Sequence, residues 1–133
     1  MGSNEIKTGT IFSAGVVNPY SEFFIGETFL TSLASSPDGE VTVGSVSFEP
    51  SSRNNWHIHH DGYQILLVTA GEGWYQEEGH PAQELKKGDR IVTGNGVKHW
   101  HGAKKDSRFE HIAITAGTAE WLEPVSDAVY TKL

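Results

Sequence analysis

The residues best suited to chemistry are the histidines, of which the chain has seven. Six of them fall in two short stretches and in the segment that follows the second: His57, His59, His60, His99, His101 and His111. The pair His57-Ile58-His59 is the most informative, because alternate side chains of a β-strand project to one face. Two imidazoles aimed at one point are half of a site for Mn²⁺, Fe²⁺, Ni²⁺ or Zn²⁺. Taken alone, such a pair fits histidines that hold no metal equally well.

A second segment repeats this arrangement. Val97, His99 and His101 would share one face of a later strand. The sequence has no cysteine, which excludes disulfides, thiolate ligands and cysteine nucleophiles. Any metal chemistry must therefore rest on nitrogen and oxygen ligands.

The segments that carry these residues have the pattern of an all-β protein. Apolar residues mostly alternate in short runs between turn residues, over about 23–33, 41–48, 63–69, 74–77, 84–85, 90–93, 97–103 and 109–115. The alternation slips at Gly44-Ser45, which predicts a bulge or a strand covered on both faces. The run 63–69 is nearly all apolar, which predicts a strand buried on both sides. About eight to ten strands at this spacing indicate a sandwich or barrel. Only the tail favours a helix, a single turn capped by Ser126.

Length and composition indicate one domain over residues 1–133. The 37% of hydrophobic and 20% of charged residues are ordinary for a globular protein, and no repeat or linker interrupts the chain. A net charge of −7, with no basic cluster larger than a lysine pair, argues against nucleic acid or an anionic membrane as a partner. No apolar run approaches the roughly 18 residues of a membrane span. The first residues lack the pattern of a secretory signal, so we expect a cytoplasmic protein.

Two stretches match the spacing of the two motifs of the cupin superfamily, which the chain resembles. The first motif is Gly, five residues, His-x-His, three or four residues, Glu, six residues and Gly; here it runs Ser51, His57, His59, Gln64 and Gly71. The second is Gly, five residues, Pro-x-Gly, two residues and His; here it runs Gly88, Gly94, Gly96 and His99. The resemblance implies a double-stranded β-helix, or jelly-roll barrel. Its core would span about 40–115, with N-terminal strands at 10–34 and a C-terminal tail at 116–133.

The resemblance also implies one divalent metal ion per chain, Mn²⁺ before Fe²⁺, Ni²⁺ or Zn²⁺. Its ligands would be His57, His59, Gln64 and His99. Gln64 departs from the motif, because it offers a neutral carbonyl oxygen where Glu offers a carboxylate. Three imidazoles and an amide leave the ion its full charge, which strengthens it as a Lewis acid and suits an oxidised M³⁺ state less well.

A closer resemblance covers most of the chain. The segments that carry it are Phe48-Glu49-Pro50, Trp56-His57, Thr69-Ala70-Gly71, 98–103 and 120–127. They are similar to a group of small bacterial cupins that includes hydroxynitrile lyases and cupins labelled carboxymuconolactone-decarboxylase-like. Some members bind Mn²⁺ and cleave or form (R)-cyanohydrins. The resemblance thus implies a metal-dependent lyase that acts on small, aromatic hydroxynitriles or related carbonyl compounds.

Within that interpretation, further residues receive roles. His101 is the candidate catalytic base, since it lies one strand repeat, about 7 Å, from His99; it would otherwise orient a ligand or face a wet barrel mouth. His111 should point inward and contact substrate or His101, although a core histidine fits as well. Thr115 is expected to line the cavity. Trp56 could provide a wall for an aromatic substrate, while burial in the core is the commoner fate of tryptophan.

Two alternative functions stay open. Other mononuclear cupins are dioxygenases that use Fe²⁺, and a cupin can also bind a small ligand without catalysis. In all three cases the partner is a small molecule. Cupins commonly pair through outer strands, so we expect a homodimer or homotetramer.

Overall fold

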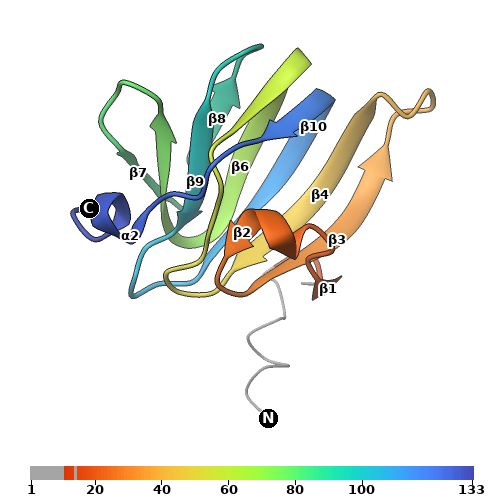
Figure 1. The fold of residues 1–133 in the computed structure, drawn as a ribbon. Coiled ribbons are helices and arrows are strands. Elements are labelled where there is room, and N and C mark those ends of the chain that lie inside the picture. Colours follow the sequence, from red (N-terminus) through yellow and green to blue (C-terminus); the bar gives the residue numbers. More distant parts are fainter. Residues whose placement is uncertain (1–10, 14) are drawn as a thin grey trace.

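The computed structural model describes residues 11–13 and 15–133. The first ten residues of the expected domain, and with them the first residue of the N-terminal strands expected at 10–34, lie outside the described residues. The elements, in chain order, are β1 (Val16–Val17), the 3₁₀ turn η1 (Ser21–Phe23), β2 (Phe24–Ile25), β3 (Thr28–Ser35), β4 (Val41–Phe48), β5 (Arg53–Asn54), β6 (His57–Glu77), β7 (Gln83–Lys86), β8 (Arg90–Thr93), β9 (His99–Ala103), β10 (Phe109–Trp121) and helix α2 (Asp127–Tyr130). Figure 1 shows their arrangement.

One sheet accounts for all of these strands. Its order is β1-β3-β4-β10-β6-β9-β5-β2, and β7 and β8 also pair with β6. The pairings are antiparallel except for that of β6 with β9, which is parallel. The 21-residue strand β6 pairs with four others, so the sheet curls around it (Figure 1). The chain therefore has the expected all-β jelly-roll fold with one short helix at its C-terminus.

The main hydrophobic core lies inside one part of the barrel that this curled sheet forms. Its buried members are Phe48, Leu66, Val68, Tyr75, Leu85, Ala103 and Phe109. On β6 the expected burial of both faces is only partly present, because Leu66 and Val68 are buried while Ile65 and Leu67 on the other face are half-buried. Alternate side chains of β6 face the inside of the barrel. Those in the middle of the strand build the core, and those nearer its N-terminal end are polar.

The slip in alternation at Gly44-Ser45 does not mark a bulge in β4. This strand keeps an unbroken register with β10, and the irregularity in its pairing with β3 falls between Ser32 and Ala34. A Cβ atom on Gly44 would lie 3.2 Å from Cδ1 of Leu30, so the glycine makes room for the leucine across the strand pair. The slip instead reflects the second expected outcome, a strand covered on both faces, because Val41 and Val43 are half-buried on one face and Phe48 is buried on the other.

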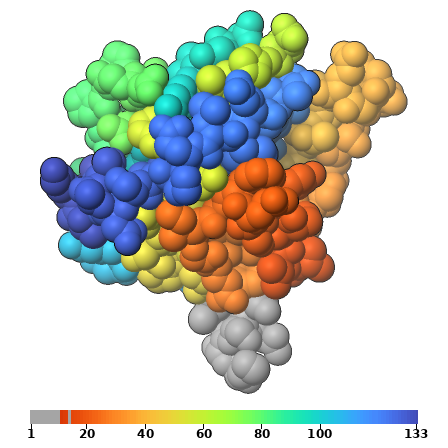
Figure 2. All heavy atoms as spheres, in the orientation of Figure 1, coloured from red at the N-terminus to blue at the C-terminus, as the bar shows by residue number. Residues whose placement is uncertain are grey.

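The C-terminal tail packs on the outside of the barrel (Figure 1). The hydroxyl of Ser126 accepts a hydrogen bond from the backbone N–H of Val129 at 3.2 Å, which confirms the expected cap. A second buried cluster joins the tail to β9 through Trp100, Val125 and Tyr130. Figure 2 shows the N-terminal elements beside the end of β10, where the rings of Phe23 and Trp121 stack with centroids 4.9 Å apart. In the part of the chain that is described, no helix has the length and apolar character to cross a membrane.

Candidate metal centre

Seven of the eight predicted site residues lie on three strands, and the eighth, Trp56, precedes β6. β6 carries His57, His59 and Gln64, β9 carries His99 and His101, and β10 carries His111 and Thr115. The five histidines and Gln64 are all buried. Most of them face one cavity of about 440 Å³, whose lining includes His57, His59, Gln64, His101, His111 and Thr115.

A bulge allows Gln64 to share a face with the histidines. Five residue steps separate His59 from Gln64, and an odd number of steps in a regular strand would place them on opposite faces. Between these residues the pairing of β6 with β10 shifts register, and Asp61 takes a positive φ of 58°. The extra residue restores the inward direction, so the four-residue gap of the motif is a structural requirement of the site.

Backbone carbonyls orient two of the imidazoles. Nδ1 of His57 donates to the carbonyl of Asn55 at 2.8 Å, and Nδ1 of His99 donates to the carbonyl of Val97 at 3.0 Å. The ring centroids of these two histidines lie 4.1 Å apart. With the hydrogen held on Nδ1, each ring keeps a lone pair on Nε2, which is the arrangement of metal-ligating histidines.

The imidazole of His59 is buried without a hydrogen-bond partner. The residue is only 3% exposed, and neither of its ring nitrogens has a hydrogen-bond partner among the described residues. A buried polar group left in this way costs about 1–3 kcal/mol. Its ring lies 5.1 Å from that of His57 and 5.3 Å from that of His99, measured between centroids. A cation between the three rings would satisfy these nitrogens.

Gln64 directs its oxygen toward the same region. Its Nε2 donates to Oγ1 of Thr115 at 3.1 Å. Its Oε1 lies 3.4 Å from Nε2 of His99 and 3.3 Å from Nε2 of His101. Neighbouring ligands about 2.1 Å from one octahedral ion are about 3 Å apart, so this spacing suits a metal site.

His101 is closer to the cluster than a separate base would be. One ring nitrogen each from His57, His99 and His101 lies within 4.8 Å of the others, which makes a three-histidine group that could hold a metal ion. His101 also has partners of its own, since its Nδ1 lies 3.2 Å from Nε2 of His111 and the amide of Asn54 contacts its ring. The residues thus fit a divalent ion, with four imidazoles and one amide oxygen within reach.

Burial keeps these imidazoles neutral. Loss of hydration lowers the pKa of His99 to about 4 and that of His111 to about 3. Burial, followed by the neighbouring imidazoles, also places the pKa values of His57 and His101 well below the usual range. Apart from the histidines, none of the described residues that line the cavity is acidic or basic. A metal ion here would meet neutral ligands, which need lose no proton near pH 7 to bind it.

The positions of three residues differ from expectation. Trp56 does not line it: its side chain packs on the outer cluster around Trp100, with Nζ of Lys98 5.4 Å from its ring centroid. Trp121 lines the cavity instead, and its ring lies 4.6 Å from that of His57. The alternation of β10 continued past Thr115 would have identified it. Asn54 was also missed, and its two-residue strand gives no periodic signal.

This fold and this histidine cluster define a small cupin with a candidate metal centre. Residues 44–115 match the cupin domain, and the chain belongs to the cupin family. It is 38% identical over 117 residues to (R)-mandelonitrile lyase of Granulicella tundricola, a match that covers 84% of this chain and 88% of that protein.

Solved structures show the same relationship. A cupin-like protein from Thermotoga maritima superimposes with a TM-score of 0.86 at 42% identity, over 93% of this chain and 96% of that one. A predicted oxalate decarboxylase from the same organism has a TM-score of 0.65 at 21% identity, over 71% of this chain and 84% of that one. The second likeness concerns the fold alone.

Proposed function

We propose that this chain is a metal-dependent hydroxynitrile lyase acting on small aromatic hydroxynitriles. The observation that carries the proposal is the 38% identity to (R)-mandelonitrile lyase along most of both chains. It is supported by the buried rings of His57, His59 and His99, which lie together with the Gln64 oxygen directed at them and give a Lewis-acid lyase the ligands it needs.

In this proposal His57, His59, Gln64 and His99 hold one divalent ion, which we propose to be Mn²⁺. Such an ion, when bound, supplies a Lewis acid that lowers the pKa of a hydroxyl group beside it. The hydrogen bond from Gln64 to Thr115 uses the amide N–H and leaves the carbonyl oxygen directed at the histidines. Thr115 thereby orients the one non-histidine ligand.

His101 takes the substrate proton in the proposed reaction. Burial holds this imidazole in its neutral form, and its Nε2 lies at the cavity beside the Gln64 oxygen. The cyanohydrin hydroxyl gives its proton to His101, and its oxygen forms the carbonyl of an aldehyde. The carbon–carbon bond to the nitrile breaks with its electron pair on cyanide. Cyanide then receives the proton from His101 and leaves as hydrogen cyanide.

The rest of the cavity suits an aromatic ring. Phe24, Val46 and Trp121 contribute apolar walls, and the volume of about 440 Å³ lies in the range of small-molecule sites. The neutral ligand set also favours this reaction over the alternative of an Fe²⁺ dioxygenase, because the described residues that line the cavity offer no carboxylate to stabilise an oxidised ion.

The test measures metal content and cyanide release on the same samples. The Mn²⁺-loaded protein should hold about one ion per chain and release cyanide and benzaldehyde from (R)-mandelonitrile. His57→Ala should lose both metal and activity, whereas His101→Ala should keep the metal and lose about 100-fold in rate, the loss typical of a missing general base. His80→Ala, on the exposed turn after β6, is the control and should retain both.

Other results would contradict the proposal. A metal-loaded protein that releases no cyanide but consumes O₂ with Fe²⁺ bound would be a dioxygenase. One that binds (R)-mandelonitrile without turning it over would be a binding protein. A protein that takes up no metal after loading would show that these residues form no metal site.

We also propose that the chain self-associates. The outer face of the sheet carries half-buried Ile65 and Leu67, and Val92 beside them on β8 is 69% exposed. A second copy is the partner we expect to cover this face. Light scattering should give the mass of a dimer or tetramer, and a mass near one chain would contradict it.

A further inference from the structure

Three rings from distant parts of the sequence lie in a row beside the candidate metal centre. Phe23 of η1 and Trp121 at the end of β10 stack with an interplanar angle of 2° and centroids 4.9 Å apart. The Trp121 ring in turn lies 4.6 Å from that of His57, at an angle of 32°. Trp121 thus contacts a proposed metal ligand and also a ring that is not among the described residues lining the cavity. The proposed reaction gives this row of rings no role so far.

The register of the sheet brings Trp121 to His57. The two residues are direct partners in the antiparallel pairing of β10 with β6. The Cβ atoms of such partners lie about 5 Å apart, so their rings can meet on one face of the sheet. The backbone continues this alignment beyond the strands, because the N–H of Leu122 donates to the carbonyl of Trp56 at 2.8 Å and the N–H of Trp56 donates to the carbonyl of Glu123 at 3.0 Å. Backbone pairing therefore fixes the contact between the two rings.

The same two segments also hold the residue that orients the edge of the His57 ring. The carbonyl of Asn55 accepts the hydrogen bond from Nδ1 of His57 at 2.8 Å. The backbone N–H of Asn55 donates to the carbonyl of Phe23 at 2.8 Å, and its side-chain Nδ2 donates to the carbonyl of Leu122 at 3.1 Å. Asn55 is only 8% exposed, so water has little access to these bonds. The acceptor of the His57 hydrogen bond is therefore anchored both from η1 and from the segment just after β10.

A hydrogen bond at one edge of an imidazole still leaves the ring free to tilt. The bond from Nδ1 of His57 fixes the direction of that edge, but rotation about this direction would move Nε2. A second ring packed against the imidazole opposes the rotation, because the tilted ring would either clash with its neighbour or lose contact with it. Groups that orient a metal-ligating histidine typically change the metal affinity by about 10- to 100-fold when they are removed. The contact with Trp121 is placed to have such an effect.

We propose that Trp121, backed by Phe23, is a positioning residue that holds the imidazole of His57 at one tilt, so that its Nε2 stays available to the metal ion. The inference rests on the proposed function in one respect, which is that His57 is a ligand of that ion. In this role Trp121 contacts neither the ion nor the reacting atoms, and it acts only through the ring of His57.

The direct test measures metal binding, which needs no turnover of substrate. Calorimetric titration of the metal-free full chain with Mn²⁺ gives the Kd, and circular dichroism shows whether each variant is folded. Trp121→Leu removes the ring, and its Kd should rise about tenfold. Trp121→Phe keeps a ring at the position opposite His57, and its Kd should stay within about twofold of the wild-type value. Equal Kd values for the wild type and Trp121→Leu would overturn the proposal.

The EPR spectrum of bound Mn²⁺ separates positioning from a general loss of stability. The wild type should give the spectrum of one defined site, and Trp121→Leu should give a broadened one because His57 takes several tilts. Trp74→Leu is the matched control, since it makes the same change at a half-buried tryptophan that packs on the outer cluster around Trp100. It should leave the Kd and the spectrum unchanged. The same broadening in Trp74→Leu would assign the effect to lost stability and overturn the positioning role.

Phe23→Leu decides the matter if Trp121→Leu does not fold. It removes the outer ring and leaves Trp121 and His57 in place, so its Kd for Mn²⁺ should rise by about threefold, less than in Trp121→Leu. An unchanged Kd would overturn the proposal. If the affinities change as expected while the wild-type protein releases no cyanide, the proposed reaction fails and the positioning role stands. Cyanide release together with unchanged affinities would give the reverse conclusion.

Discussion

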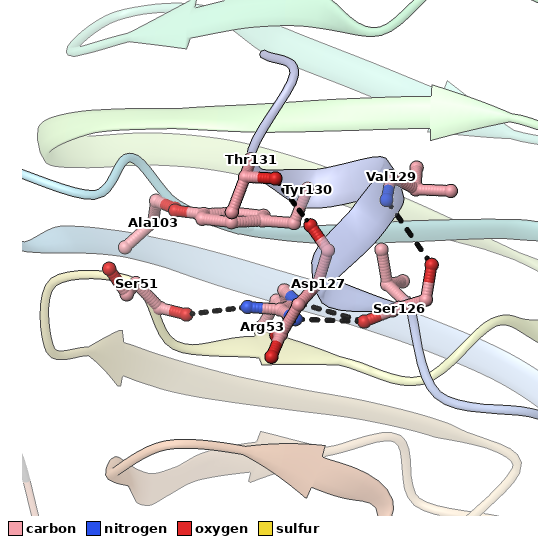
Figure 3. Close-up of polar contacts among 9 residues, drawn as sticks. Ser51, Arg53, Ala103, Ser126, Asp127, Val129, Tyr130 and Thr131 are labelled. Atoms are coloured by element: carbon pink, nitrogen blue, oxygen red, sulfur yellow. Dashed lines mark hydrogen bonds and ion pairs between the residues drawn. The ribbon is translucent and has the colours of Figure 1, made fainter.

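The guanidinium carbon of Arg53 lies 4.2 Å from the ring centroid of Tyr130, whose hydroxyl donates to the carbonyl of Ala103 at 2.6 Å (Figure 3). Arg53 belongs to β5, Tyr130 to the last helix and Ala103 to β9, so the two contacts join the tail to the strands that position the site. The strand that presents Asn54 inward is thus held from outside by the end of the chain.

Replacing Arg53 should therefore loosen the whole tail. Arg53→Met removes the ring contact and leaves the carbonyl of Val125 without its donors, and we expect the free energy of unfolding to fall by about 3 kcal/mol. Urea denaturation measures this loss. Asp127→Ala is the control, since this carboxylate is 88% exposed and its pair with Arg53 should contribute less than about 1 kcal/mol. Equal losses in the two variants would assign the stability to the ion pair instead.

Two glycines with similar backbone angles should differ sharply in their tolerance of alanine. Gly71 has a φ of 74° and Gly79 a φ of 85°. A Cβ atom on Gly71 would lie 1.8 Å from the carbonyl oxygen of Arg108, whereas one on Gly79 would meet nothing within 4 Å. Gly79→Ala should cost about 1–2 kcal/mol from the left-handed conformation alone. Gly71→Ala should cost about 1–3 kcal/mol more because the backbone must move, and thermal unfolding of both variants compares them. Similar losses would mean that the left-handed conformation alone, without the close approach of Arg108, explains why glycine stands at position 71.

Much of the fold could be predicted because it depends on local patterns. The alternation of apolar residues located the strands, and the His-x-His spacing placed His57 and His59 on one inward face. Gly71 was expected from the cupin motif, and the cap at Ser126 from a local backbone requirement.

The rest of the site depends on contacts between distant segments. The alternation of β10 directs Trp121 inward, but its place against His57 follows from the register of β10 on β6, which the local sequence does not encode. Asn54 meets His101 only because β5 pairs with β9 across the barrel. The position of His101 within the three-histidine group likewise results from the curvature of the sheet, which residue spacing does not encode.

Restoring the carboxylate of the cupin motif should separate metal binding from the proposed chemistry. Gln64→Glu adds a negative charge to a cavity that has no acidic side chain among its described lining residues. Mn²⁺ should bind on the order of tenfold more tightly, since affinity rises with ligand charge. Cyanide release should fall, because the added charge weakens the ion as a Lewis acid. Calorimetric titration with Mn²⁺ and the cyanide assay measure the two effects, and a variant that gained in both would contradict the role given to the neutral amide.

The buried histidine His111 should make the metal-free protein sensitive to acid. Burial lowers its pKa from the ordinary 6.5 to about 3, so below pH 6.5 the unfolded chain binds a proton that the folded chain does not. The contribution of neutral His111 to the free energy of unfolding is therefore fully present above that pH. It is lost as the pH falls toward 3, with a slope of at most about 1.4 kcal/mol per pH unit.

The variant His111→Leu isolates this contribution. Other buried histidines and the carboxylates titrate in both proteins, so the difference between the two curves of unfolding free energy against pH reports His111 alone. The wild-type curve should fall more steeply between about pH 6 and 4, and the two should run parallel above about pH 7.5. Urea denaturation in the presence of a chelator gives both curves. Parallel curves throughout would mean that His111 takes up its proton in the folded protein as readily as in the unfolded chain.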